Sequence, residues 1–125
     1  MKYKTQNRWT TMIKPEERSI LHQYIILDMA IRSLQQDYST LEKLKMSKIY
    51  IPIVDDLLKT IRSDFYNKKR LLSQKGISVV KWVKTDDYFS EVTIKTKGED
   101  VVLQYANQAI KTQVEKLILS YLKGE

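Results

Sequence analysis

Residues 71–100, "LLSQKGISVVKWVKTDDYFSEVTIKTKGED", contain the point at which the chain changes from helical to β periodicity. Gly76 follows a run with helical spacing and precedes Ile77, the pattern of a glycine cap whose next residue packs back on Leu71 or Leu72. The residues after it are rich in β-branched and aromatic side chains, which favour strands. The sequence therefore predicts that a helix ends at Gly76 and that a sheet follows.

Two strands are predicted in this stretch, over residues 77–84 and 88–96, with turn residues at 85–87 between them. Polar and apolar residues alternate along the second strand, which indicates one buried face. Because a two-stranded hairpin is only marginally stable alone, we expect it to pack on the helices.

The first of these strands carries "KWVK", residues 81–84. Strand alternation places Val80 and Trp82 on one face and Lys81 on the other. We therefore expect Trp82 to pack against the helices while Lys81 is exposed.

Two helices are predicted before the sheet. The first begins at Pro15, since proline suits the first helical position and two acidic residues follow it, and it extends to about Lys45. The second begins at Ser47 or Pro52 and ends at Gly76. Both carry apolar stripes with helical spacing, so we expect an antiparallel hairpin. The stripes consist of Ile20, Tyr24, Leu27, Ile31, Leu34, Tyr38 and Leu41 in the first helix, and Val54, Leu57, Leu58, Ile61, Phe65 and Leu72 in the second.

The segment after Gly98 has two interpretations. Acids at 99–100 resemble a helix start, and apolar residues from Leu103 to Tyr121 keep helical spacing to Gly124; we favour this helix. Alternatively, "VVLQY" (101–105) forms a third strand. The favoured fold is α+β in the order α-α-β-β-α: a long antiparallel helical hairpin, a β-hairpin and a C-terminal helix. It forms one domain over residues 15–125, preceded by a basic N-terminal arm over residues 1–14.

The net charge of +7 is concentrated in two places. Residues 1–14 carry four bases and no acid, and residues 47–75 carry seven bases and three acids. Such clustering is typical of a polyanion-binding protein, and it equally keeps a basic protein soluble. No apolar run is long enough to span a membrane.

The chemistry of most enzyme classes is missing. Cysteine is absent, the three glycines are dispersed, and His22 is the only histidine and falls off the apolar stripe. Adjacent carboxylates on a helix do not face one another, so the acidic pairs do not form a catalytic dyad. We expect no catalytic residue, no cofactor and no metal.

Bases interleaved with aromatic residues are the candidates for contact with a partner or with nucleic acid. They lie on the second helix, on the arm and on the first strand. The candidate contact residues are Arg8, Trp9, Lys59, Arg62, Tyr66, Lys69, Arg70, Lys81 and Lys84. Lys68 is unusual because it falls within the apolar face of its helix; we expect it to extend past Leu72 or to meet a carboxylate of the first helix.

Three segments carry a resemblance to other proteins: "KPEERSILHQYIILDMAIRSL", "NKKRLLSQKGISVV", which contains the K-G-I junction, and the ending "VEKLILSYL". In this pattern the chain resembles small uncharacterised proteins of Bacillus-type genomes, including their prophage and mobile-element regions. The resemblance implies a bacterial or phage cytoplasmic setting and carries no functional residues across.

These patterns favour a small non-enzymatic regulatory or adaptor protein that acts in the cytoplasm by binding another protein. The alternative is a basic DNA- or RNA-binding protein that uses the second helix, the arm and the β-hairpin. A winged-helix reader needs a short recognition helix, whereas the helix before this hairpin is long and amphipathic. We also expect a homodimer or larger assembly, because one partner helix is too narrow to cover both the apolar stripe of the first helix and its flank of Leu21, Ile25, Ile26 and Met29.

Overall fold

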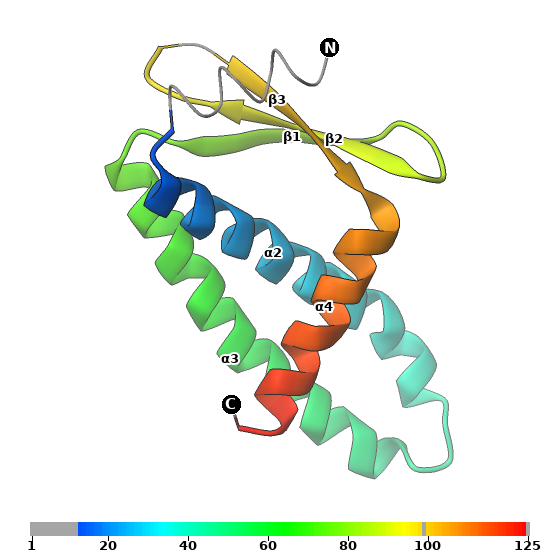
Figure 1. Cartoon of the computed structure of the whole chain (residues 1–125). Coiled ribbons are helices and arrows are strands. Elements are labelled where there is room, and N and C mark those ends of the chain that lie inside the picture. Colours follow the sequence, from blue (N-terminus) through cyan, green and yellow to red (C-terminus); the bar gives the residue numbers. More distant parts are fainter. Residues whose placement is uncertain (1–12, 99, 125) are drawn as a thin grey trace.

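The computed structural model describes residues 13–98 and 100–124, and in this part of the chain three helices pack with a three-stranded antiparallel sheet. This arrangement confirms the α+β class (Figure 1). The elements are α2 (Pro15–Glu42), α3 (Ser47–Gln74), β1 (Ser78–Lys84), β2 (Phe89–Lys95), β3 (Asp100–Ala106) and α4 (Asn107–Leu122).

Residues 100–106 form a strand, so the helix that we favoured there is wrong and the order is α-α-β-β-β-α. Strand β3 pairs along its whole length with β2, and Leu103 lies opposite Val92. Val101 and Leu103 are buried while Val102 between them is exposed, which is the period of a strand. Val101, Val102 and Leu103 also fit a helix, but they pair with β2 as part of a strand. Helix α4 therefore begins only at Asn107.

Helix α2 is the central element of the fold (Figure 1). It pairs with α3 as the predicted antiparallel hairpin, α4 crosses it, and the sheet lies over its N-terminal half. These neighbours bury Leu21, Ile25 and Ile26 within one chain and half-bury Met29. The flank that was expected to need a second copy is thus already covered, and that argument for a homodimer is wrong.

Strand β1 contains a bulge that sequence alternation does not predict. The register of β1 against β2 shifts between Val79 and Lys81. As a result Val79 and Trp82 both pack against the core, and Val80 is 58% exposed. The expectation that Val80 shares a face with Trp82 is therefore wrong, whereas a half-buried Trp82 beside an exposed Lys81 is confirmed.

The predicted helix ends are close to those observed. Helix α2 begins at Pro15, and the backbone N–H of Lys14 donates a hydrogen bond to Glu17 Oε1 at 3.1 Å. Helix α3 begins at Ser47, which leaves Pro52 inside it. At the other end Gly76 has a φ of +74°, a value that glycine adopts without strain. The buried Ile77 donates its backbone N–H to the Leu72 carbonyl at 2.9 Å, which confirms the predicted cap.

The core extends beyond the N-terminal end of α2. Ile13, which we assigned to the arm, is 1% exposed and belongs to the same buried cluster as the core residues of α2 and α3. Within the described residues, no helix is both long enough and apolar enough to cross a membrane.

Candidate functional site

Helix α3 presents a row of exposed bases and one exposed aromatic residue. Tyr66 meets Phe65 edge-on at 5.2 Å between ring centroids, and Phe65 stacks on Tyr24 at 4.8 Å. The Tyr24 pKa is raised, chiefly because burial disfavours the phenolate and secondly because Asp28 is near. All five predicted residues of this helix are exposed, namely Lys59, Arg62, Tyr66, Lys69 and Arg70.

The two lysines of "KWVK" lie on opposite faces of the sheet. Lys81 is paired with Thr93 on the outer face, while Lys84 is paired with Ser90, whose side chain is buried on the inner face. Lys84 faces the helices and lines a groove beside α2. One surface therefore does not hold both lysines. Arg8 and Trp9 lie outside the described residues.

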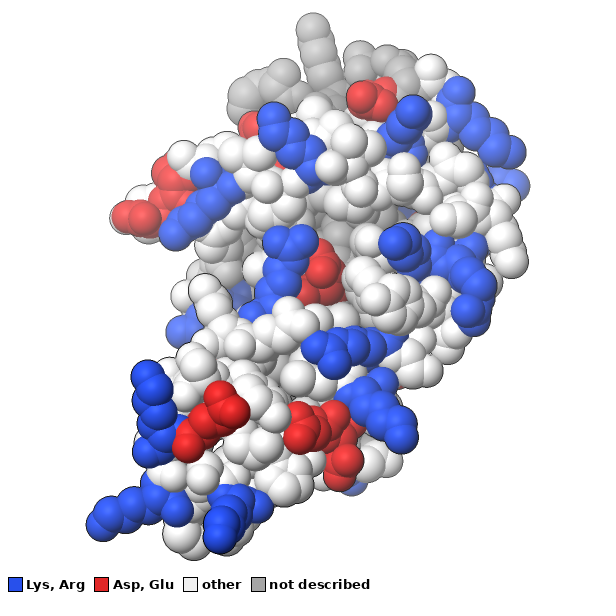
Figure 2. All heavy atoms as spheres, turned by 180° about the vertical axis from the view of Figure 1, so that it is seen from behind, with Lys and Arg blue, Asp and Glu red and all other residues white. Residues whose placement is uncertain are grey.

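The charged side chains on the back of the molecule are mixed (Figure 2). Blue basic groups are spread over this whole face, with acidic groups between them, and several project at its lower left, where the α2–α3 hairpin ends. Positive charge is thus not gathered into one continuous field on this face.

The strongest exposed feature is the end of the helical hairpin, residues 43–53, which we call the hairpin end. Five of its six large apolar side chains are 39–52% exposed, and the sixth, Ile51, is half-buried. The segment also holds three lysines and has no acidic residue. The exposed apolar residues are Leu44, Met46, Ile49, Tyr50 and Ile53, and the lysines are Lys43, Lys45 and Lys48. Apolar side chains gathered on a surface mark interaction sites.

The apolar surface of the hairpin end continues onto α4. A small cavity of about 240 Å³ is lined by Ile53 of α3 and by Leu122 of α4. Leu119 and Leu122 are both about half exposed. Helix α4 ends at Leu122, near Ile53, so it leaves one side of the first turns of α3 uncovered, while α2 packs on another side.

Sequence reasoning missed this surface, although its signal was present in "KLKMSKIYIPI" (43–53). Apolar residues are unusually dense there for the connection between two helices. They also continue upstream of Val54, where the apolar stripe of the second helix was taken to start.

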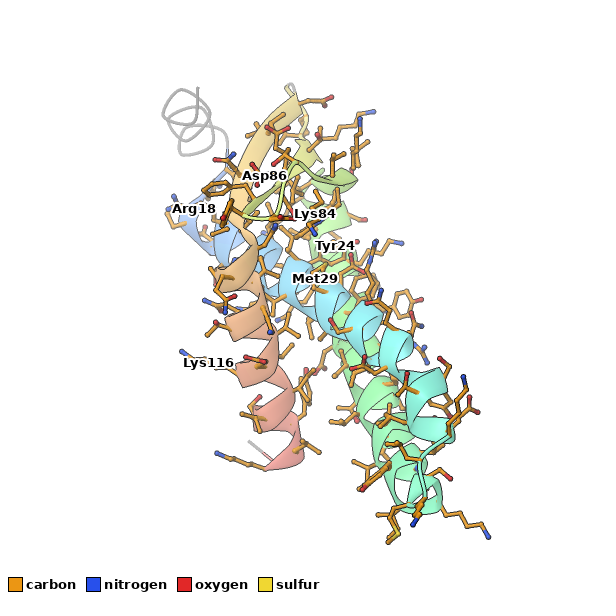
Figure 3. All side chains as sticks on the ribbon, turned by 90° about the vertical axis from the view of Figure 1, so that its right-hand side faces the viewer. Arg18, Tyr24, Met29, Lys84, Asp86 and Lys116 are labelled. Carbon is orange, nitrogen blue, oxygen red and sulfur yellow. The ribbon has the colours of Figure 1, made fainter. Side chains whose placement is uncertain are left out.

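Two cavities flank α4. The first, which we call the interhelical cavity, has a volume of about 570 Å³ and lies between α2, α3 and α4. The second, a groove of about 580 Å³, lies between α2, α4 and the β1–β2 end of the sheet. In Figure 3, which faces the side of this groove, Met29 on α2 lies below Lys84 and Asp86.

Polar contacts fix the walls of both cavities. Ser90 Oγ donates to Asn107 Oδ1 at 2.6 Å, and Asn107 Nδ2 donates to the Asp86 carbonyl at 3.1 Å, which ties the β1–β2 turn to the start of α4. In the interhelical cavity, the Tyr121 hydroxyl donates to Asp64 and so joins α4 to α3. Burial and this hydrogen bond raise the Tyr121 pKa well above its usual value.

His22 takes a place that the sequence did not indicate. It is half-buried, lines the interhelical cavity and stacks on Tyr105 with 6.1 Å between ring centroids. Tyr105 also stacks on Trp82 at 6.2 Å, and burial raises the Tyr105 pKa to about 12. Strand β3, which brings Tyr105 to this position, was not the favoured interpretation.

The whole described domain falls within one protein family. A family model described as YhjD protein matches residues 12–125. The chain belongs to the YhjD protein family. The YhjD match spans the hairpin end, the sheet and both cavities, so each candidate site lies within the region that defines the family. No curated protein and no solved structure matches the chain.

Proposed function

We propose that this protein is a small, non-enzymatic regulatory or adaptor protein of bacterial or prophage type that acts in the cytoplasm by binding another protein. The observation that carries this proposal is the hairpin end, where five large apolar side chains are exposed together. Apolar surface of this kind gains free energy when a partner removes it from water.

The chemistry of the hairpin end specifies the partner. Its apolar residues call for an apolar face, and Lys43, Lys45 and Lys48 call for acidic groups around that face. An acidic amphipathic helix has both features. Because α4 stops beside Ile53, such a helix has room to lie along the first turns of α3.

A second copy of this chain suits the same surface less well. A symmetric dimer through the hairpin end would bring the three lysines of each copy together, since the same patch meets itself across a two-fold axis. Like charges at an interface oppose association. We therefore place an acidic partner, and not a second copy, on this surface.

A peptide-binding measurement tests the proposal. A fluorescent, acidic amphipathic helical peptide is titrated with the protein, and a peptide with the same apolar residues but lysines in place of its acids serves as the control ligand. We expect only the acidic peptide to bind, and its affinity to fall as salt is added because the lysines are exposed.

The matching variant is Ile49→Ser with Ile53→Ser, which removes apolar surface from exposed positions and costs little stability. The control variant is Val80→Ser with Val102→Ser, which makes the same chemical change on exposed sheet positions. The hairpin-end variant should lose binding and the sheet variant should keep it. Equal binding by both variants, or a dimer in sedimentation equilibrium that only the hairpin-end variant disrupts, contradicts an acidic partner at this surface.

Nucleic acid is the second candidate partner, and the exposed row on α3 favours it. Lys59, Arg62 and Lys69 are exposed and form no ion pair with any described residue. Tyr66, 54% exposed among them, offers a ring on which a base can stack. Charge reversal at these three bases should abolish duplex or single-strand binding at low salt without lowering stability. Absence of binding by the wild-type protein at low ionic strength removes this candidate.

A further inference from the structure

One wall of the interhelical cavity carries a partly buried lysine. Lys68 lies on the wall formed by α3 and is half-buried. We expected it to extend past Leu72 or to meet a carboxylate of the first helix, and it forms no ion pair with any residue that the structure describes. A partly desolvated ammonium group favours an anion beside it.

Asp64, the acid best spaced to pair with Lys68 along α3, bonds to a residue of α4. Asp64 lies one helical turn before Lys68, the spacing at which an acid and a base on a helix pair. Here Asp64 instead accepts the hydrogen bond of the Tyr121 hydroxyl from α4. The Tyr121 hydroxyl thus bonds one oxygen of Asp64, and Lys68 forms no ion pair with this carboxylate.

The remaining lining of the cavity adds donors and an apolar floor. Lys116 and Gln113 lie on the opposite wall, on α4. The Asn67 oxygen accepts a hydrogen bond from Arg70, which leaves the amide nitrogen of Asn67 to donate. The floor is apolar, with Ile26 and Leu27 buried and Leu117 half-buried.

We infer that the interhelical cavity binds a small anion that carries an apolar group, with the anionic head beside Lys68 and Lys116 and the apolar body on Ile26, Leu27 and Leu117. The volume of about 570 Å³ lies within the range of small-molecule sites. Two lysines face one acid that Tyr121 already engages, so the lining favours an anion over a cation. Carboxylates and phosphate monoesters share this chemistry. This site is separate from the hairpin end and does not depend on the partner proposed there.

Calorimetric titration of the full chain distinguishes the two kinds of head group. The ligands are sodium octanoate, octyl phosphate, 1-octanol and inorganic phosphate. We expect one or both of the anionic amphiphiles to bind with one-to-one stoichiometry, and the better of the two identifies the head group. Octanol lacks the charge and inorganic phosphate lacks the apolar body, so each should bind at least about tenfold more weakly.

Two lysine variants locate the anion. Lys68→Met keeps the apolar stem and removes the charge, and it should weaken amphiphile binding about tenfold or more. Lys69→Met removes a neighbouring exposed charge that does not line the cavity, and it should leave binding unchanged. In methyl NMR spectra the bound amphiphile should shift the signals of Ile26 and Leu117, and not those of Ile110 in the other groove.

Four results would overturn the inference. The first is that neither amphiphile binds, and the second is that octanol binds as tightly as the anions. The third is that inorganic phosphate binds as tightly as octyl phosphate, and the fourth is that the Lys68→Met variant binds the amphiphiles as well as the wild type does. An equal loss in the Lys68 and Lys69 variants would also overturn it, because it would show a response to overall charge. Circular dichroism of each variant confirms that a loss of binding does not come from a loss of fold.

Discussion

Replacing Gly76 by alanine should lower stability, because this residue ends α3 in a conformation that other residues adopt at a cost. Its φ is +74°. An L-residue in the left-handed region loses roughly 1–2 kcal/mol relative to glycine. A Cβ at this position would also lie 2.7–2.8 Å from side-chain carbons of Lys97. Those atoms belong to a flexible exposed side chain that can move away, so the contact adds little.

The assay is urea denaturation followed by circular dichroism. With a slope of about 1–3 kcal/mol per molar for a small domain, a loss of about 1.5 kcal/mol lowers the midpoint by roughly 0.5–1.5 M. Combining Gly76→Ala with Lys97→Ala in a double-mutant cycle separates the backbone cost from the side-chain contact. We expect the coupling to be below about 0.5 kcal/mol.

Gly124 provides a matched control for Gly76. It has almost the same φ, +75°, but an added Cβ would meet nothing within 4 Å. It follows the last turn of α4, where fraying relieves strain at little cost to the rest of the fold. Gly124→Ala should therefore leave the midpoint nearly unchanged. If Gly76→Ala is as stable as the wild type, or no less stable than Gly124→Ala, then the positive φ does not limit how α3 ends and the reasoning is refuted.

Three further perturbations test the core and its polar contacts. Burial raises the Tyr105 pKa to about 12, so the folded state favours the neutral phenol. The free energy of unfolding should therefore be unaffected by this group below pH 10 and should fall by up to about 2.7 kcal/mol as the pH rises towards 12. Denaturation at several pH values should show this decline in the wild type and a smaller one in Tyr105→Phe. Ile13→Ala should cost about 2–4 kcal/mol in denaturant, since Ile13 is 1% exposed; a loss below 1 kcal/mol would place it outside the core. Tyr121→Phe should cost about 1–2 kcal/mol, because its hydrogen bond to Asp64 is partly buried. Tyr38→Phe should cost clearly less, because its hydrogen bond to Asp55 is exposed, and equal losses in the two variants would show that burial does not set the difference.

Local signals in the sequence were sufficient for α2, α3 and the first two strands. The start of α2 at Pro15 and the cap at Gly76 depend on residues within one turn of each end, so a short window contains all the information. The alternation along β2 was equally clear, and its inward residues Ser90, Val92 and Ile94 are buried as their spacing indicates. The α+β class follows from these elements alone.

Two features of the sheet required contacts that no short window contains. Residues 101–105 fit both a helix, which we favoured, and a strand, and pairing with β2 selected the strand. The bulge near Val80 arises from the register between β1 and β2. Because of it, Val79 faces the core and Val80 faces solvent, the reverse of what strict alternation predicts.

The candidate sites divide in the same way. The sequence identified the exposed bases of α3 and singled out Lys68, because helical spacing states which side of a helix a residue occupies. It could not state that Asp64 would be engaged by Tyr121, 57 residues further along the chain, or that His22 would stack on Tyr105. Nor could it state that α4 would end beside Ile53 and leave the hairpin end exposed. A sequence specifies the faces of its helices and strands through local geometry, whereas the packing of distant elements determines which faces are covered and which charges keep a partner.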